Sequence, residues 1–404
     1  MTFRVFRFYF IIIFCLSTIQ FYSPVFIPFS VLSLINYVFF LATVSFIIVS
    51  NTDTKEKIYT NPFFLLTIAI LISGFSAWYS WGQGLLDSFK PLTYYLSYNL
   101  FFLLLIWKTR VKDIEQIILL LGVIYIIVFS VTFLFHPIQI FGGIQDFADD
   151  RGFQRITLPG TGFLFLFSFY SLKQYLKERR LLWLIIFIIS DIFIVMLLSR
   201  TLMFVSFIIF TLFILRLSSI FKKIIALLFI GCFAFLISQM EFFQLLTEQT
   251  KEQRENVEED IRVLSATFYL NEFSPNTFSR IFGNGEGTIE SSYGQNIDYL
   301  KNELGYYQSD IGYIGLYSKF GILAILAYLF LIYKTIKIPI PDDYLYFKYY
   351  LYFIFIISTI IDASFSTGYI TSIALSAYVL YSKDLKRINN RRELQSDFLT
   401  LVNA

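Results

Sequence analysis

Long apolar runs separated by short polar segments make up most of this chain. A helix that crosses a bilayer needs about 20 mostly apolar residues, and about 12 runs of that kind can be recognised. The first run follows two arginines, as the apolar part of a signal peptide would, but no small-residue cleavage site follows it. We therefore interpret it as a retained helix and predict an all-α, polytopic membrane protein. The runs lie near residues 6–22, 25–49, 62–81, 91–107, 114–136, 157–175, 181–198, 201–217, 220–240, 310–333, 344–361 and 368–382.

The distribution of Lys and Arg predicts how these runs are oriented. Cytoplasmic loops of membrane proteins carry an excess of both residues. If both termini are cytoplasmic and every run spans, most of the 32 basic residues fall on the cytoplasmic side. This topology leaves a short outer segment over residues 137–156 and a long one over residues 241–309, inserted before the last three helices. We interpret residues 1–404 as one membrane domain with an external cap.

Composition supports the same class. Apolar residues make up 57% of the chain and charged residues 15%, whereas soluble domains average about 45–50% and about 25%. These values argue against a soluble enzyme, a nucleic-acid binder and a disordered scaffold. A net charge of +3 is too small to indicate a polyanionic partner. With two Cys and one His, neither a metal site nor a cofactor is expected.

The long outer segment contains two local patterns. Val257, Ile261, Leu264 and Phe268 recur at helical spacing among charged residues, which predicts an amphipathic helix. The Gly-x-Gly-x-Gly stretch at residues 283–287 resembles phosphate-binding turns, but a dinucleotide fingerprint needs a preceding strand and a following helix. We expect a tight turn that brings backbone amides close to the functional centre.

Arginines on the outer side are the first candidate functional residues, because positive-inside statistics would leave that side poor in cations. The planar guanidinium binds phosphate through two parallel hydrogen bonds, which suits a lipid-linked pyrophosphate. The alternative is that each arginine pairs with a nearby acid or with ordinary lipid phosphate. The outer arginines are Arg151, Arg155, Arg200, Arg262 and Arg280.

Two charged residues lie inside predicted spans. Asp191 is in the run 181–198 and Lys319 in the run 310–333, at similar depths from the outer end. Because an isolated charge in the bilayer is costly, we hypothesise that the two residues face each other across the bundle. Such a pair would either fix helix packing or take part in catalysis.

Three short segments have a recognisable pattern. Residues 199–201 (Ser-Arg-Thr) lie at an outer turn, residues 271–275 precede the Gly-rich stretch, and residues 309–315 begin the run that closes the long segment. With the Phe-rich multispan chain, they resemble the bacterial O-antigen and capsular polysaccharide polymerases, which are similar to the O-antigen ligases.

Spacing within the outer segments refines the resemblance. Some polymerases carry an Arg followed eleven positions later by Gly in each of two outer loops. Arg151 and Gly162 have that spacing, whereas Arg280 is followed by Ser291. The loop His of the ligases is missing as well, which favours a polymerase over a ligase.

The resemblance implies a GT-C-like glycosyltransferase of the bacterial inner membrane. The donor would be a glycan on undecaprenyl pyrophosphate and the acceptor a single lipid-linked repeat unit, without metal or cofactor. Asp310 or Glu303 would orient or deprotonate the acceptor hydroxyl, and Arg200 would stabilise the departing pyrophosphate. Other implied partners are membrane lipid, a chain-length regulator and a flippase. The implied pyrophosphate and glycan ligands are Arg151, Arg155, Arg262 and Arg280.

Two other functions stay open. A lipid-linked oligosaccharide flippase would have a similar number of helices, but it would need polar residues throughout a central cavity and short loops on both sides. An ion-coupled transporter built on Asp191 and Lys319 would need inverted repeats with broken helices at matching positions. The long outer segment and the outer arginines favour the polymerase over both.

Overall fold

The computed structural model describes residues 3–49, 57–135, 138–142, 156, 158–197, 199–217 and 260–384. These residues form helices and turns, without any strand among them, so the predicted all-α class is confirmed for this part of the chain. Four helices are long and apolar enough to cross a membrane: Phe29–Val49, Pro62–Trp81, Val111–Leu134 and Gly312–Lys337. The predicted run 220–240 and the predicted site residues Arg151 and Arg155 lie outside the described residues.

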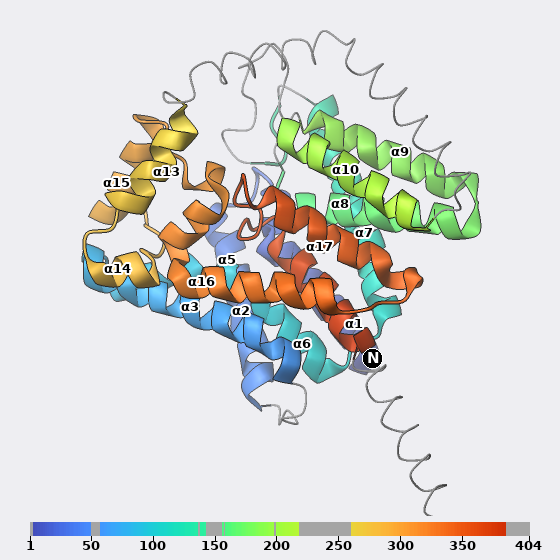
Figure 1. Ribbon diagram of the computed structural model, residues 1–404, viewed down its shortest axis with the longest axis horizontal. Coiled ribbons are helices and arrows are strands. Elements are labelled where there is room, and N and C mark those ends of the chain that lie inside the picture. Colours follow the sequence, from blue (N-terminus) through green and yellow to red (C-terminus); the bar gives the residue numbers. More distant parts are fainter. Residues whose placement is uncertain are drawn as a thin grey trace, which may run out of the picture.

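Most of the predicted apolar runs within the described residues correspond to a helix (Figure 1). The helices are α1 (Phe3–Thr18), α2 (Phe29–Val49), α3 (Lys57–Trp81), α7 (Val111–Leu134), α8 (Thr161–Glu178), α9 (Leu181–Met196), α10 (Arg200–Leu217), α16 (Gly312–Lys337), α17 (Leu345–Ile357) and a last helix over residues 370–384.

The run 91–107 is an exception, because it is not one continuous helix. It consists of α5 (Leu92–Tyr95), the 3-10 turn η3 (Leu96–Asn99) and α6 (Leu100–Trp107), and it follows the short helix α4 (Leu85–Phe89). Within η3, the Asn99 side chain donates to the carbonyl of Leu96 at 2.8 Å. A local side-chain bond of this kind competes with the regular helical ladder. Apolar composition alone did not reveal the break.

Helix α2 buries several polar side chains and exposes many of its large apolar side chains. Ser33, Asn36 and Thr43 are buried, whereas Leu41 is 61% exposed and Ile48 76% exposed. A water-soluble fold would place these groups the other way round. An outward apolar surface is what hydrocarbon requires.

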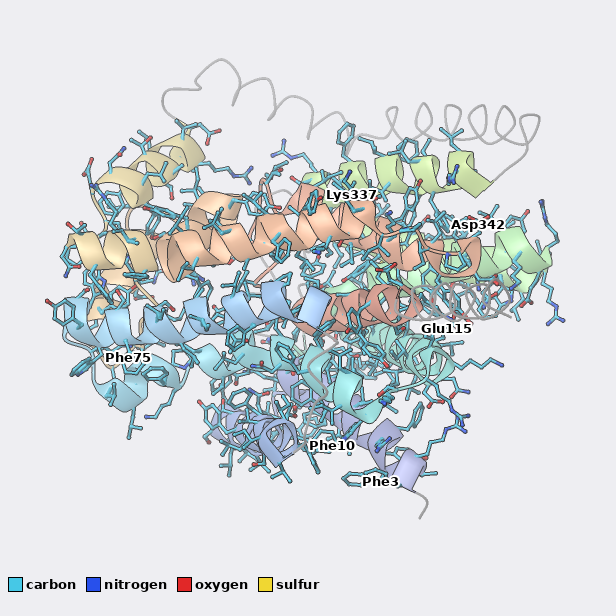
Figure 2. All side chains as sticks on the ribbon, turned by 60° about the horizontal axis from the view of Figure 1, so that its bottom comes forward. Phe3, Phe10, Phe75, Glu115, Lys337 and Asp342 are labelled. Atoms are coloured by element: carbon cyan, nitrogen blue, oxygen red, sulfur yellow. The ribbon has the colours of Figure 1, made fainter. Side chains whose placement is uncertain are left out.

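Contacts join segments that the topology assigns to the same side. The Arg4 guanidinium lies 2.6 Å from the Asp113 carboxylate, and the Tyr346 hydroxyl donates to Glu115 at 3.2 Å. Arg4 and Asp113 belong to segments predicted to be cytoplasmic, and Glu115 and Tyr346 lie at the predicted cytoplasmic ends of the runs 114–136 and 344–361. In Figure 2, Glu115 and Asp342 lie at one end of the molecule and Phe75 of α3 at the other.

At the Phe75 end, part of the long outer segment is folded against α3 and α16 (Figure 1). Its helices are α13 (Ile261–Asn271), α14 (Thr277–Phe282) and α15 (Ser292–Asn302), followed by the 3-10 turn η5 (Gln308–Asp310). We call these four elements the outer helices. Each of the three α-helices begins at a side-chain cap: Asp260, Asn276 and Ser291 accept a hydrogen bond from an amide of the first turn.

The predicted helix near residue 261 is confirmed, but its buried face is not the one formed by the apolar residues at helical spacing. Ile261 and Leu264 are exposed, and Ser265 and Tyr269 are the buried residues of α13. Tyr269 packs in an aromatic cluster, and its hydroxyl donates to a backbone carbonyl at 3.1 Å. An aromatic ring buries more surface than an aliphatic side chain, so the tyrosine decides which face turns inward. Val257 lies outside the described residues.

The Gly-rich stretch passes between α3 and α16, where α16 is interrupted. Gly321 has φ +73° and ψ −174°, which divides α16 into two helical parts. The amide of Asn284 donates to the carbonyl of Ser318 at 2.9 Å, and the amide of Gly285 donates to the carbonyl of Lys319 at 2.8 Å. These carbonyls precede the break, and in a bilayer they need internal partners. These two amides therefore bond to the backbone of the broken helix.

Glycine is required here by both conformation and space. Gly283 has φ +85°, and a Cβ on it would lie 2.4 Å from the carbonyl oxygen of Lys319. Gly285 has φ +69°, and its Cβ would lie 2.6 Å from the carbonyl oxygen of Ser73. Only a residue without a side chain lets three backbones approach this closely.

We predict that Gly285→Ala destabilises the protein more than Gly82→Ala. Both positions have positive φ, but a Cβ on Gly82 would meet nothing within 4 Å. The strained backbone costs about 1–2 kcal/mol at either position, and overpacking adds about 1–3 kcal/mol at Gly285 alone. Thermal unfolding of the purified full-length variants in detergent measures the difference. Equal losses of Tm would contradict the close packing of the Gly-rich stretch.

Candidate functional site

A cluster of one lysine and two carboxylates lies where the Gly-rich stretch meets the broken helix. Lys319 Nζ lies 3.2 Å from Glu286 Oε2 and 4.0 Å from Asp362 Oδ2. The Lys319 side chain is 10% exposed and that of Asp362 6%, whereas Glu286 is 26% exposed. Glu286 is therefore the member that another molecule can reach most easily. We call these three residues the Lys319 cluster.

Aromatic side chains surround the Lys319 cluster and supply one further polar group. The Tyr95 hydroxyl of α5 donates to Glu286 Oε2 at 3.0 Å, and Lys319 Nζ lies 5.8 Å from the centroid of the Tyr95 ring. The Tyr95 and Phe320 rings are 4.9 Å apart, and Phe320 also packs on Phe365. These rings exclude water, so the ion pairs act at low dielectric and are stronger than surface pairs.

Glu286 is positioned by a network centred on Gln83, in the turn after α3. Gln83 Nε2 donates to the backbone carbonyl of Glu286 at 3.1 Å. Gln83 Oε1 accepts from the Thr288 amide at 3.0 Å and from the Ser291 hydroxyl at 2.7 Å. The buried amide thus holds the backbone on the C-terminal side of the acid and ties it to the start of α15.

Asp362 lies in the turn between α17 and the last helix. Its amide donates to the carbonyl of Ser309 at 2.7 Å, and its Oδ1 accepts from the Phe365 amide at 3.3 Å. The turn is thereby joined to η5 of the outer helices. Three separate segments of the chain therefore supply the cluster, and a backbone contact fixes each of them.

The charges of the cluster do not balance when both acids are ionised. Burial raises the pKa of Asp362 to about 6; Lys319 opposes this rise and Glu286 adds to it. One lysine cannot neutralise two neighbouring carboxylates. Asp362 therefore takes up a proton more readily than an ordinary aspartate, which suits a group that accepts or transfers protons.

The predicted pair of Asp191 and Lys319 is not formed. Asp191 accepts a hydrogen bond from the Ser168 hydroxyl of α8 at 3.0 Å, while Lys319 pairs with Glu286 and Asp362. Equal depth along two helices says nothing about the direction in which each side chain points. The partners of Lys319 come from non-helical segments, and helical spacing cannot place those segments.

The outer arginines that the structure describes lie on α10, α13 and α14. Arg262 and Arg280 are exposed, and Arg280 Nη2 donates to the carbonyl of Asn271 at 2.6 Å. Arg200 is the first residue of α10 and is half-buried. Arg280 is thus bonded within the outer helices. The predicted grouping of five arginines around one phosphate site stays a prediction.

The two acids predicted to act on the acceptor have different environments. Glu303 follows α15 at its C-cap and is exposed. Asp310 ends η5, is half-buried and accepts from the Ser309 hydroxyl at 3.1 Å. Because the carbonyl of Ser309 contacts Asp362, Asp310 is adjacent in the chain to a residue that touches the cluster.

Sequence reasoning named Lys319 but missed Asp362, Tyr95 and Gln83. One signal was present for Asp362, since it directly follows the predicted run 344–361 at its outer end. Tyr95 had no distinguishing signal among 28 tyrosines. Only the bend after α5 and the path of the Gly-rich stretch bring it to Glu286.

Within the described residues, no group of three or more His, Cys, Asp or Glu side chains is arranged to hold a metal ion. Comparisons with protein-family models, curated proteins and solved structures find no significant match to this chain.

A double-mutant cycle tests which acid pairs with Lys319. Residues in contact show interaction energies of about 0.5–3 kcal/mol, whereas distant residues are additive within about 0.3–0.5 kcal/mol. We expect coupling in the contact range between Lys319→Met and Glu286→Gln. Lys319→Met and Asp191→Asn should be additive. Unfolding of the purified full-length variants gives these energies, and coupling to Asp191 alone would contradict the observed pairing.

Proposed function

We propose that this protein polymerises undecaprenyl-pyrophosphate-linked oligosaccharide repeat units into O-antigen or capsular polysaccharide. It acts on the outer face of the bacterial inner membrane as a GT-C-like enzyme with about 12 spans and cytoplasmic termini. The observation that carries the proposal is the Lys319 cluster, a proton-accepting carboxylate site beside the outer helices. The resemblance in sequence to the polymerases supplies the substrate class.

In the proposed reaction the acceptor's sugar hydroxyl lies against Glu286, the most accessible member of the cluster. The hydroxyl proton passes to the cluster as the oxygen attacks the anomeric carbon of the donor glycan. The bond between that carbon and the pyrophosphate oxygen breaks, and undecaprenyl pyrophosphate leaves. Proton uptake changes the net charge of the cluster from −1 to neutral. Lys319 favours the ionised carboxylate, so it orients the base in the form that accepts the proton.

The arginines have the complementary role in this proposal. Arg200 and the outer-segment residues Arg151, Arg155, Arg262 and Arg280 bind the pyrophosphate and stabilise the charge that develops on it. Asp310, beside the cluster in the chain, and Glu303 contact the acceptor glycan. Membrane lipid, a chain-length regulator and a flippase are the proposed partners.

Glu286→Gln tests the proposal directly. The purified protein is incubated with lipid-linked repeat units extracted from the producing cells, and the products are separated on a gel. Loss of a general base slows a reaction by about 10²–10⁴-fold, so we expect single repeats in place of a ladder. Glu290→Gln, at an exposed neighbour, is the matched control and should keep the ladder. A full ladder made by Glu286→Gln at the wild-type rate would refute the catalytic assignment.

The pH dependence of kcat/KM gives a second test. Because burial raises the pKa of Asp362 to about 6, the cluster is protonated below that pH and the rate should fall on the acid side with a midpoint near 6. Asp362→Asn leaves a balanced Lys319–Glu286 pair, which binds a proton less readily, so its acid limb should move to lower pH. Asp191→Asn should keep the wild-type midpoint. An identical profile for Asp362→Asn would exclude the cluster as the titrating group.

Translocation of the same lipid-linked oligosaccharide is the second candidate function. The break in α16 at Gly321, next to a buried charge, favours it, because transporters bind substrates and ions at interrupted helices. Proteoliposomes that contain a labelled lipid-linked oligosaccharide separate the two functions. A flippase exposes the label to an external quencher or enzyme without lengthening the glycan, whereas a polymerase lengthens it.

A further inference from the structure

A basic pocket of about 180 Å³ lies where the start of α1 meets the turn between α6 and α7. In Figure 1 this end of α1 is far from the outer helices. The pocket is separate from the Lys319 cluster and has no part in the proposed reaction. Its polar lining consists of Arg4, Arg7, Lys108, Thr109, Arg110 and Asp113.

The positive charge of the pocket exceeds its negative charge. Asp113 is the only acid that lines it and is paired with Arg4 at 2.6 Å. Among the described residues, no carboxylate lies within ion-pair distance of Arg7, Lys108 or Arg110. Three cations therefore surround the pocket without a counter-charge from this part of the chain, which favours an anionic occupant.

Two buried polar atoms at the pocket also lack a partner among the described residues. They are Nε of Arg7 and the hydroxyl oxygen of Thr109. The Arg7 guanidinium is held in place, because Nη1 donates to the carbonyl of Trp107 at 2.8 Å and its carbon lies 3.9 Å from the Phe3 ring centroid. A buried donor without an acceptor is costly, and an oxygen atom of a bound anion would satisfy it.

The start of α7 adds donors on the same side. Arg110 is the N-cap residue of this 24-residue helix, and its side chain makes no capping hydrogen bond. The Asp113 amide already donates to the Arg110 carbonyl at 3.0 Å. The amides before it, of Val111 and Lys112, have no intrahelical acceptor, and the helix dipole favours negative charge there. The cations, the unpartnered atoms and the helix start all suit a group with several acceptor oxygens.

We propose that this pocket binds the phosphate group of an anionic phospholipid. A volume of about 180 Å³ is below the range of about 300–1,000 Å³ typical of sites for whole small molecules, and it matches a headgroup better. The pocket lies at the ends of apolar helices, in segments predicted to be cytoplasmic, and Trp107 and Phe8 form part of its wall. Basic pockets between helices at that surface bind lipid headgroups, and aromatic residues gather at the same level.

Short-chain phosphatidylglycerol is the probe, added to the purified full-length protein in a neutral detergent. We expect it to raise the Tm in a concentration-dependent way, and short-chain phosphatidylcholine to leave the Tm unchanged. Lys108→Ala/Arg110→Ala should weaken phosphatidylglycerol binding by about 30-fold with little change in the Tm without lipid, because both side chains are exposed. Lys112→Ala is the matched control, exposed in the same basic segment but outside the pocket lining, and should change binding less than about twofold.

Thr109→Val distinguishes a binding role from a structural one. Removing an unpartnered buried hydroxyl should preserve or raise the Tm without lipid, and it should weaken binding if the hydroxyl contacts the phosphate. Equal effects of phosphatidylglycerol and phosphatidylcholine, or equal binding by the Lys108/Arg110 and Lys112 variants, would overturn the proposal. If inorganic phosphate raises the Tm as much as phosphatidylglycerol does at equal concentration, the assignment to a lipid is overturned.

Discussion

The need to accommodate Lys319 inside a membrane helix determines much of the surrounding architecture. A lone ammonium group in this position would be strongly destabilising, and two carboxylates from outside its own helix surround it. One of them arrives on the Gly-rich stretch and the other on the turn after α17. Because both must reach the same nitrogen atom, the outer helices and the last two helices are held in one arrangement around α16.

The break in α16 and the glycines of residues 283–287 depend on each other. The interrupted helix presents two carbonyls to the Gly-rich stretch, whose amides satisfy them. The absence of Cβ atoms then lets the stretch lie directly on the backbone. This contact converts an outer segment into a rigid support for Glu286, in the way that a catalytic or binding acid needs its orientation set by neighbouring groups.

Polar groups thus occupy two ends of the molecule with different roles. At the end with the outer helices they are buried, paired and joined by hydrogen bonds to the Lys319 cluster. At the basic pocket, among the described residues, three cations lack a carboxylate partner and two buried atoms lack a hydrogen-bond partner. The first arrangement suits chemistry on a substrate hydroxyl, and the second suits an anion supplied by the membrane. The apolar surface between them, seen on α2, is suited to lipid.

The sequence by itself determined the all-α class of the described residues and the positions of most of their helices, because hydrophobic length is a local property of the chain. It also brought Lys319 to notice, since charge inside an apolar run is costly wherever the run packs. The tertiary structure decided the partners: it separated Asp191 from Lys319, turned Tyr269 inward in place of Ile261, and brought Tyr95 and Asp362 to the cluster. These outcomes depend on helix rotation and on the paths of non-helical segments, and neither follows from periodicity.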